Sequence, residues 1–361
     1  MSCFVEDLIP VILNSNDHWW DRDLVRLALV SPGWLHYIRR KLYISPTLHS
    51  FSACASLART LGTNPNLASL VQNLTLRPTC AGASRGSSKE RMSVRSLLGL
   101  GGLQGLVLGG ELAIQAERFL GFITAADTLT QLHIDGAMLR TSLTSRASLE
   151  WSDDLVFRFP NLKRLKLTDL DVDINPVLVP TPLQMDELVL ANVNIISGFL
   201  SHLIPEGSTL GRLCVMTSSG CEYDEHIRMV LYSSSVHTLE YEVLKASPSD
   251  GFFLEPAGIP SPRALLQLRR LELHGLHVDN GVLISVGHWC PEIEELVVSG
   301  RLVCLTAEDW KTYLTSGALS SLRRLMLTWG TNHPPYQPWC ANAVELLTQA
   351  TSVRRIELIP L

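Results

Sequence analysis

Two histidines have the spacing closest to that of a metal-binding or catalytic site. His274 and His277 stand three positions apart, a separation that two metal ligands can use. No third ligand lies near them in the sequence, and both follow a predicted strand, so we expect histidines of a turn. Residues 99–102 are rich in glycine but precede a strand, whereas a phosphate-binding loop follows a strand and opens a helix. No serine has the setting of a nucleophile elbow. We therefore expect no enzyme, metal or cofactor.

Composition narrows the class of protein further. The 361 residues are 46% hydrophobic and 18% charged, without the run of apolar residues that spans a bilayer. A net charge of -5 argues against a general nucleic-acid binder. The eight cysteines include no Cys-x-x-Cys pair, and the first residues lack the basic flank of a secretory signal. We predict a folded intracellular protein, cytoplasmic or nuclear, that binds neither membrane nor nucleic acid.

A repeated apolar pattern predicts the architecture. Eleven times between Val71 and Leu358, a large aliphatic residue is followed by a second after two variable residues and by a third apolar residue after one more. The copies recur about every 28 residues, and each ends with the alternation of a strand that buries one face. The predicted strands lie near residues 71–76, 103–108, 129–134, 162–167, 185–190, 210–215, 236–241, 268–273, 293–298, 322–327 and 353–358. Helical periodicity predicts helices over residues 111–126, 196–204, 224–232, 282–289, 308–314 and 341–350.

One strand and one helix cannot bury an apolar face alone, so such units must stack. The pattern is similar to that of leucine-rich repeats. The resemblance implies an α/β solenoid over residues 46–361, a horseshoe with parallel strands on its concave face and helices outside. Three residues beyond the third apolar position, where that family often has Asn or Cys, this chain has Leu170, Val193, Leu276 or Ala137. We expect these residues to extend the buried row and make the curvature less uniform.

Residues 1–45 do not belong to the repeat. Their periodicity predicts short helices over residues 6–13, 23–30 and 34–43, with Asp21 and Asp23 at the N-cap of the second. A module of this size has a marginal core and needs a partner or the repeats to hold it.

The N-terminal module resembles an F-box. Residues 4–13 read FVEDLIPVIL, in register with the opening helix of that family, and residues 23–34 read DLVRLALVSPGW, in register with its Asp-Leu-x-x-Leu-x-x-Val-(Ser/Cys)-x-x-Trp motif. The Arg39 to Tyr43 stretch, RRKLY, looks like the end of fungal F-box-like domains. The chain departs from the family at Phe4-Val5, where the family has Leu-Pro, and at Pro10, which lies inside the first predicted helix.

The F-box resemblance implies a partner. Such modules dock a Skp-type adaptor, and through it a cullin, in SCF-type ubiquitin ligases, where the rest of the chain binds a protein substrate. The adaptor contacts that it implies are Leu8, Ile12, Leu13, Leu24, Leu27, Val30 and Trp34. The alternative is a ligase-independent interaction scaffold whose N-terminal helices only cap the repeats.

A protein target would sit on the concave face. Residues on either side of the central apolar position of each strand point away from the core. The predicted target-binding residues are Arg164, Lys166, Glu187, Arg212, Arg270, Glu272, Glu295, Arg324, Met326 and Arg355. Because neighbouring strands lie about 4.8 Å apart, the alternative is that these Arg and Glu residues pair across strands and only stabilise the sheet.

Three segments interrupt the array. Residues 77–95 are rich in Ser, Gly and Arg, which predicts disorder. Residues 245–263 and 331–339 combine prolines with aromatic residues, and we predict loops at one rim of the array. Their aromatic side chains have two alternative roles, recognition of a partner and packing back on the domain.

Overall fold

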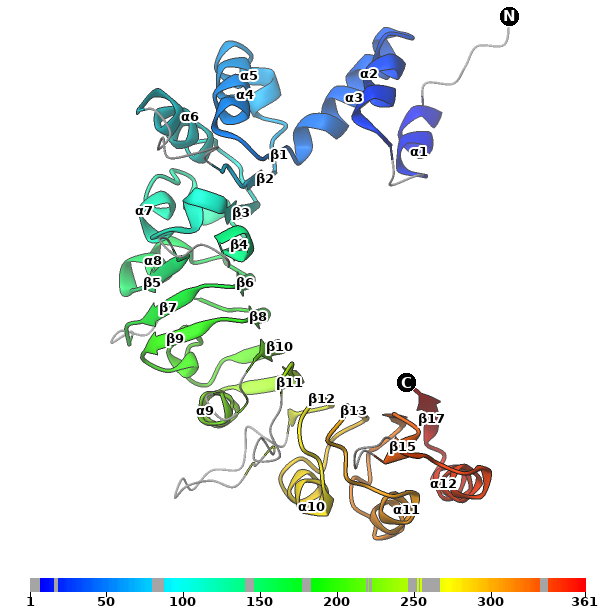
Figure 1. Cartoon of the computed structure of the whole chain (residues 1–361). Coiled ribbons are helices and arrows are strands. Elements are labelled where there is room, and N and C mark those ends of the chain that lie inside the picture. Colours follow the sequence, from blue (N-terminus) through cyan, green and yellow to red (C-terminus); the bar gives the residue numbers. More distant parts are fainter. Residues whose placement is uncertain are drawn as a thin grey trace, which may run out of the picture. The chain divides into compact units, whose positions relative to one another are not determined.

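The computed structural model describes residues 7–15, 19–79, 88–139, 146–176, 183–218, 220, 223–245, 252, 254, 267–331 and 337–361. The chain forms two compact units, Met1–Ser148 and Leu149–Leu361, and each combines parallel strands with helices (Figure 1). The chain is therefore an α/β protein. The predicted division at residue 45 stays a prediction.

Three helices begin the first unit: α1 (Leu8–Asn14), α2 (Asp21–Ala28) and α3 (Pro32–Ile44). We call them the N-terminal cluster. Both α1 and α2 pack on α3. Pro10 lies in the first turn of α1, where backbone N–H groups have no partner within the helix, so it does not break the helix.

The helix starts of the N-terminal cluster follow from local chemistry. Ser31 caps α3, because its hydroxyl accepts a hydrogen bond of 3.3 Å from the backbone N–H of Trp34. Pro32 follows at the first helical position, which needs no donor. The expected caps of α2 are wrong, since Asp21 and Asp23 lie inside that helix and its N-cap is Trp20.

The rest of the first unit places helices beside four parallel strands. The strands, in sheet order, are β1 (Thr47–Leu48), β2 (Asn73–Leu76), β3 (Gly105–Gly109) and β4 (Gln131–Asp135). Their central leucines, Leu74, Leu106 and Leu132, are buried and in register as the sequence predicts. The helical segments are α4 (Phe51–Thr63), α5 (Pro65–Ala68), α6 (Ser88–Leu98), η1 (Gly110–Ala113), α7 (Glu117–Leu120), η2 (Ala126–Thr128) and η3 (Ala137–Leu139), where η marks a 3-10 helix.

Two further expectations for the first unit are wrong. Residues 88–95 belong to helix α6, which buries Val94, Leu97 and Leu98, so the disorder predicted for residues 77–95 does not hold there. Residues 80–87 lie outside the described residues. The single helix predicted over residues 111–126 is three short helical turns, because Gln115 has a left-handed backbone (φ 52°) that interrupts a helix.

Eight parallel strands form the main sheet of the second unit. In sheet order they are β6 (Arg164–Thr168), β8 (Glu187–Ala191), β10 (Thr209–Thr217), β11 (Ser235–Val243), β12 (Arg270–His274), β13 (Glu295–Ser299), β14 (Arg324–Leu327) and β17 (Glu357–Pro360). One leucine from each strand joins a continuous row, from Leu165 to Leu358. The predicted register is confirmed for every strand but the last.

The last strand starts later than expected. Helix α12 (Ala341–Val353) runs past residue 350, and Val353, expected at the first buried position of the strand, is 86% exposed. Leu358, and not Ile356, is paired with Leu325. Arg355 has a positive φ of 57° and lies in the turn before β17.

A tight turn ends several of these strands. The residue directly after the strand has a left-handed backbone in Asp169, Asn192 and Gly275, the residue types that tolerate it. Each of them donates its backbone N–H to a carbonyl at the end of the next strand in the sheet. At Gly275 a Cβ would lie 2.1 Å from the carbonyl oxygen of Val243, so only glycine fits there.

The segments that follow the turns at Asp169 and Asn192 enter a second, smaller sheet. Its strands are β5 (Ser148–Trp151), β7 (Asp171–Ile174) and β9 (Asn194–Ser197). Leu170, Val193 and Leu276 are buried, as predicted for the position at which Asn is common, whereas Ala137 is exposed. The helix predicted over residues 196–204 is wrong in its first part, because β9 occupies it and only the 3-10 helix η4 (Leu200–Leu203) follows.

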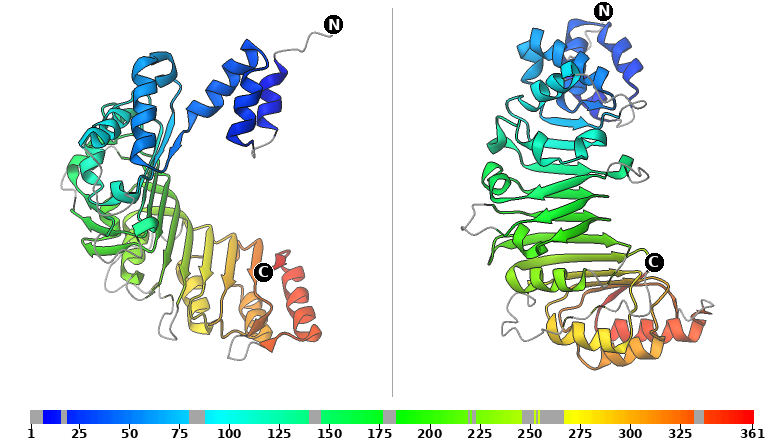
Figure 2. Two further views of the ribbon diagram at one scale, coloured as in Figure 1. Left: turned by 45° about the horizontal axis from the view of Figure 1, so that its top comes forward. Right: turned by 60° about the vertical axis from the view of Figure 1, so that its left-hand side comes forward.

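The remaining elements of the second unit are mainly the predicted helices. They are α8 (Asp153–Arg158), α9 (Asp224–Ser233), α10 (Asn280–Trp289), α11 (Ala307–Thr315), α12, and a pair of short antiparallel strands, β15 (Gly330–Thr331) and β16 (Gln337–Pro338). Helices α10, α11 and α12 follow one another along one side of the sheet (Figure 2). Phe252, from the predicted rim loop 245–263, is buried against Tyr241 and so packs back on the domain. Most of that loop lies outside the described residues.

Candidate functional site

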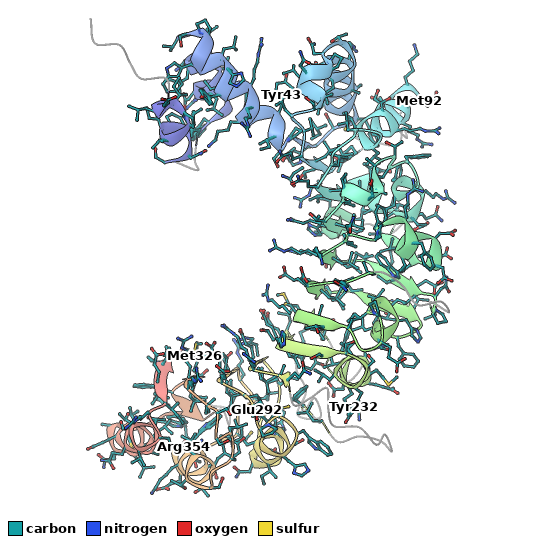
Figure 3. The ribbon with its side chains drawn as sticks, turned by 180° about the vertical axis from the view of Figure 1, so that it is seen from behind. Tyr43, Met92, Tyr232, Glu292, Met326 and Arg354 are labelled. Atoms are coloured by element: carbon teal, nitrogen blue, oxygen red, sulfur yellow. The ribbon has the colours of Figure 1, made fainter. Side chains whose placement is uncertain are left out.

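The side of the main sheet that faces away from α10, α11 and α12 is the first candidate surface. We call it the outward face. Figure 3 shows Met326 on this side of β14, whereas Arg354 lies beside helices α11 and α12. At one outward position arginine and glutamate alternate, from Arg164 on β6 to Arg212 on β10 and again from Arg270 on β12 to Glu357 on β17.

Ion pairs join the outward side chains of β6, β8, β10 and β11. Arg212 on β10 donates from one guanidinium nitrogen to Glu187 on β8 and from the other to Glu240 on β11, at 2.6 Å each. Glu187 also faces Arg164 on β6 at 3.5 Å. Each interior member of this chain therefore bridges two partners.

A second series of ion pairs crosses β12, β13, β14 and β17. Arg270 contacts Glu272 at 2.6 Å on its own strand and Glu295 at 2.9 Å on the next. Arg324 contacts Glu295 at 2.8 Å and Glu357 at 3.0 Å. The alternative of pairing across strands is thus confirmed for these residues, and their contact with a target stays a prediction.

The electrostatics of the outward face follow from these contacts. The hydrogen bond to Glu240 raises the pKa of Arg212. The hydrogen bond between His274 and Glu272, 3.2 Å long, raises the pKa of His274 above its ordinary 6.5 and lowers the pKa of Glu272 below its ordinary 4.5. When His274 is protonated, the two side chains form a charged pair. The other ring nitrogen of His274 is 2.7 Å from the Ser299 hydroxyl.

Other predicted target contacts differ in accessibility. Lys166 is exposed and has no ion pair among the residues that the structure describes. Met326 is half-buried. Val297 and Cys214, at outward positions of their strands, are only 3% exposed. Arg355 does not lie on this face, and Glu357 occupies the position that the sequence pattern assigned to it.

The N-terminal cluster is the second candidate surface. Leu13 and Leu24 form its core together with Ile9 and Ile38, and Leu27 and Trp34 pack against that core. Leu13 and Leu24 are therefore inaccessible to a partner, contrary to expectation. Ile12 is half-buried.

The accessible apolar residues of this cluster are a different set. Leu8 and Val30, from the predicted contacts, are 48% and 64% exposed. Three further residues that the prediction missed, Val11, Val25 and Leu29, are 63%, 55% and 84% exposed. Helical periodicity could have identified two of them. When Leu24 faces the core, residues 25 and 29 lie on other sides of the helix.

The described residues provide neither a metal site nor a membrane-spanning helix. No group of three or more His, Cys, Asp or Glu side chains there could hold a metal ion. His274 ends strand β12 rather than lying in the turn, and its contacts with Glu272 and Ser299 account for both ring nitrogens. No helix in the described part of the chain has the length and apolarity needed to cross a membrane.

The fold and its surfaces thus define an α/β protein with a large parallel sheet, a charged outward face and an N-terminal helical cluster. No protein-family model matches the chain, and no curated protein sequence matches it.

Proposed function

We propose that this chain is a substrate-recruiting, F-box-type subunit of an SCF-type ubiquitin ligase. In this proposal the N-terminal cluster docks a Skp-type adaptor and through it a cullin, and the strand and helix units are leucine-rich repeats of a solenoid that binds a protein target. The chain itself performs no catalysis, and the partner subunits supply the ubiquitin chemistry inside the cell. Two observations support this role, the match of residues 23–34 to the F-box motif and the surface of the cluster.

The exposed apolar residues of the cluster are the main support for docking. Its core is closed by Ile9, Leu13, Leu24 and Ile38, so Leu8, Val11, Val25, Leu29 and Val30 are not needed inside it. Large apolar side chains that the core does not need, left exposed on short helices, favour a protein contact. A cluster that only capped the repeats would gain nothing from keeping them exposed.

A pull-down with a purified fungal Skp-type adaptor tests this proposal. We expect the wild-type chain to retain the adaptor and the double variant Leu29→Asp/Val30→Asp to lose it, because a carboxylate in an apolar interface is costly to desolvate. Ile284→Asp is the matched control, since Ile284 is an equally exposed apolar residue (68%) on α10. A wild-type chain that retains no adaptor refutes the ligase role and leaves the ligase-independent scaffold.

Leu24→Asp is unsuitable for this test. Leu24 is 4% exposed in the cluster core, so its substitution would unfold the helices and abolish adaptor binding for a structural reason. Variants at exposed positions keep the cluster folded, which circular dichroism checks directly.

The target side of the proposal rests on the outward face. Most arginines and glutamates there satisfy one another, so the accessible side chains without such a bond are the better candidates for contact. Lys166 is one of them. Lys166→Glu is expected to leave the melting temperature unchanged and to weaken capture of the target, because charge reversal at an interface can cost several kcal/mol.

A further inference from the structure

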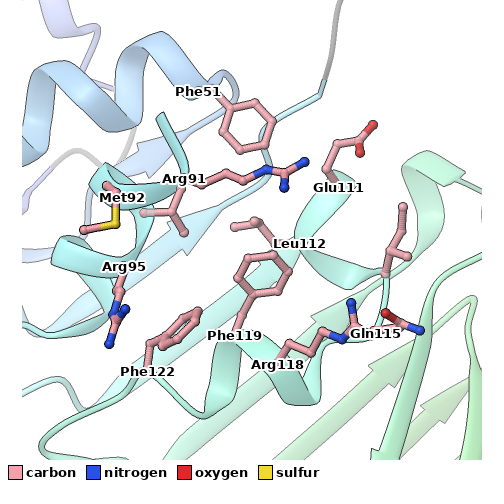
Figure 4. A pocket seen from close by; sticks show the side chains of 12 residues that line it. Phe51, Arg91, Met92, Arg95, Glu111, Leu112, Gln115, Arg118, Phe119 and Phe122 are labelled. Atoms are coloured by element: carbon pink, nitrogen blue, oxygen red, sulfur yellow. The ribbon is translucent and has the colours of Figure 1, made fainter. Parts of the chain in front are cut away.

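A cavity of about 520 Å³ opens in the first unit and shares no residue with either surface described above. It lies among α4, α6, η1 and α7 and the residues that follow α7. Its size is that of a small-molecule site. Figure 4 shows phenyl rings of Phe51, Phe119 and Phe122 around it, together with the guanidinium groups of three arginines.

The arginines give this cavity a positive charge. Arg91 and Arg95 come from one face of α6, four residues apart, and Arg118 comes from α7. Among the lining residues that the structure describes, Glu111 is the only acidic one, so their formal charge is 3 - 1 = +2. None of these four side chains forms an ion pair among the residues that the structure describes.

This arrangement has a cost without an anion. Like charges four residues apart on a helix repel each other. On the outward face of the second unit, by contrast, nearly every arginine has a glutamate within 4 Å. Arginines that gather around a cavity without acidic partners are the arrangement that proteins use to hold phosphate groups.

The aromatic lining adds a second requirement for the ligand. Phe119 and Phe122 are half-buried and come from α7 and the turn after it. The Arg95 guanidinium lies over the Phe122 ring, 4.7 Å from its centroid, which orients that cation beside an apolar wall. A purely inorganic anion would leave this wall in water, whereas a planar aromatic group would cover it.

We propose that this cavity binds a phosphate monoester that carries an aromatic group. Near neutral pH such an ester has a charge between about -1.5 and -2, which balances the +2 of the lining. The guanidinium groups of Arg91, Arg95 and Arg118 are available to the phosphate, and Phe119 and Phe122 contact the ring. Glu111 and Gln115 are available to hydrogen-bond polar groups at the edge of the ligand.

A second feature at the same place agrees with a binding role. Gln115 lines the cavity with a left-handed backbone (φ 52°), and its N–H is held by the Ser148 hydroxyl at 3.1 Å. Non-glycine residues in this conformation cost energy and cluster at ligand sites. Here the conformation separates η1 from α7 and brings both helical turns to the rim of the cavity.

Isothermal titration with phenyl phosphate tests the proposal on the full chain. We expect phenyl phosphate to bind more tightly than inorganic phosphate or phenol, since only the ester uses both parts of the site. Arg91→Gln and Arg95→Gln should each weaken it about tenfold or more, because each removes a charge-assisted bond. Arg59→Gln, at an exposed arginine on α4 outside the cavity, should change nothing.

A second variant distinguishes the contribution of the aromatic ring to binding from that of the phosphate. Phe119→Leu should weaken phenyl phosphate several-fold and leave inorganic phosphate unchanged. Should the α6 variants lose stability, Arg118→Gln on α7 gives an independent measurement of the same charge. No binding of phenyl phosphate by the wild-type chain, or equal binding by wild type and the Arg91→Gln/Arg95→Gln variant, overturns the proposal.

Two further ligands show whether the aromatic phosphate ester belongs to a nucleotide or to a phosphorylated protein. A nucleoside monophosphate and a short phosphotyrosine peptide both carry the proposed group, and each is titrated beside its dephosphorylated form. Tighter binding of one of them identifies the source and supports the site, provided that Arg95→Gln weakens it. Failure of both to bind better than their dephosphorylated forms contradicts it. The adaptor pull-down is unaffected by either result, because the cavity shares no residue with the N-terminal cluster.

Discussion

Replacement of Arg212 by glutamine tests whether the outward ion pairs stabilise the sheet. The variant removes two bonds of 2.6 Å, to Glu187 and Glu240, and keeps most of the side chain. Glu187 retains Arg164 at 3.5 Å, but Glu240 is left facing Glu272 of the adjacent strand. The loss should therefore fall mainly on the contact between β10 and β11.

The expected magnitude follows from exposure. The Arg212 side chain is 45% exposed, while Glu187 and Glu240 are 25% and 21% exposed. Pairs that are fully exposed contribute about 0.2–1 kcal/mol each. Because these carboxylates are largely covered, we expect the upper end of that range and a total loss of about 1–2 kcal/mol. This corresponds to a fall in melting temperature of roughly 2–8 °C for a domain of this size.

Thermal unfolding at low and high salt measures the effect. The difference between Arg212→Gln and wild type should shrink in 1 M NaCl, where the Debye length is only about 3 Å. Arg301→Gln is the control, at an exposed arginine without an ion pair among the described residues. Our reasoning is refuted if Arg212→Gln melts within 1 °C of wild type at low salt. Normal melting combined with weaker capture of a target would instead assign Arg212 to the interface.

Three more predictions concern other parts of the structure. His274→Gln should destabilise the protein most below about pH 6.5 and progressively less at higher pH, in melting curves from pH 5 to 9, because a raised pKa gives stability that is lost as pH rises through it. The partner Glu272 has a lowered pKa, so its own contribution is lost only in acid, below about pH 4.5. Arg354→Lys should cost about 1–3 kcal/mol in urea unfolding, because the guanidinium donates to three carbonyls, of Leu314, Ala318 and Leu319, which one ammonium cannot all reach; an unchanged midpoint would show that these bonds contribute nothing. In peptide mapping after alkylation at pH 8, exposed Cys340 should react while Cys290 stays unmodified, since burial raises the pKa of that thiol to about 12; rapid labelling of Cys290 would show that the region opens.

The sequence by itself determined the strands that carry the leucine repeat, from β2 to β14, and their order along the chain, but not β1 or the smaller sheet of β5, β7 and β9. A leucine every second residue identifies a strand with one buried face, and the same spacing in each copy aligns Leu271, Leu296 and Leu325 in one row. It also predicted that arginine and glutamate would lie at equivalent positions of adjacent strands. These features are local, because they depend only on periodicity within a few residues and on its repetition.

The tertiary structure decided what the local pattern left open. Leu24 and Leu29 are both apolar residues of the α2 region, but the packing of α2 on α3 buries the first and exposes the second. Residues 88–95 have few apolar side chains and become helical because Val94, Leu97 and Leu98 find a place beside α4. That helix directs Arg91 and Arg95 into a cavity whose aromatic wall comes from residues more than twenty positions away. Burial and the meeting of distant side chains depend on which surfaces pack together, and a single segment of sequence does not contain that information.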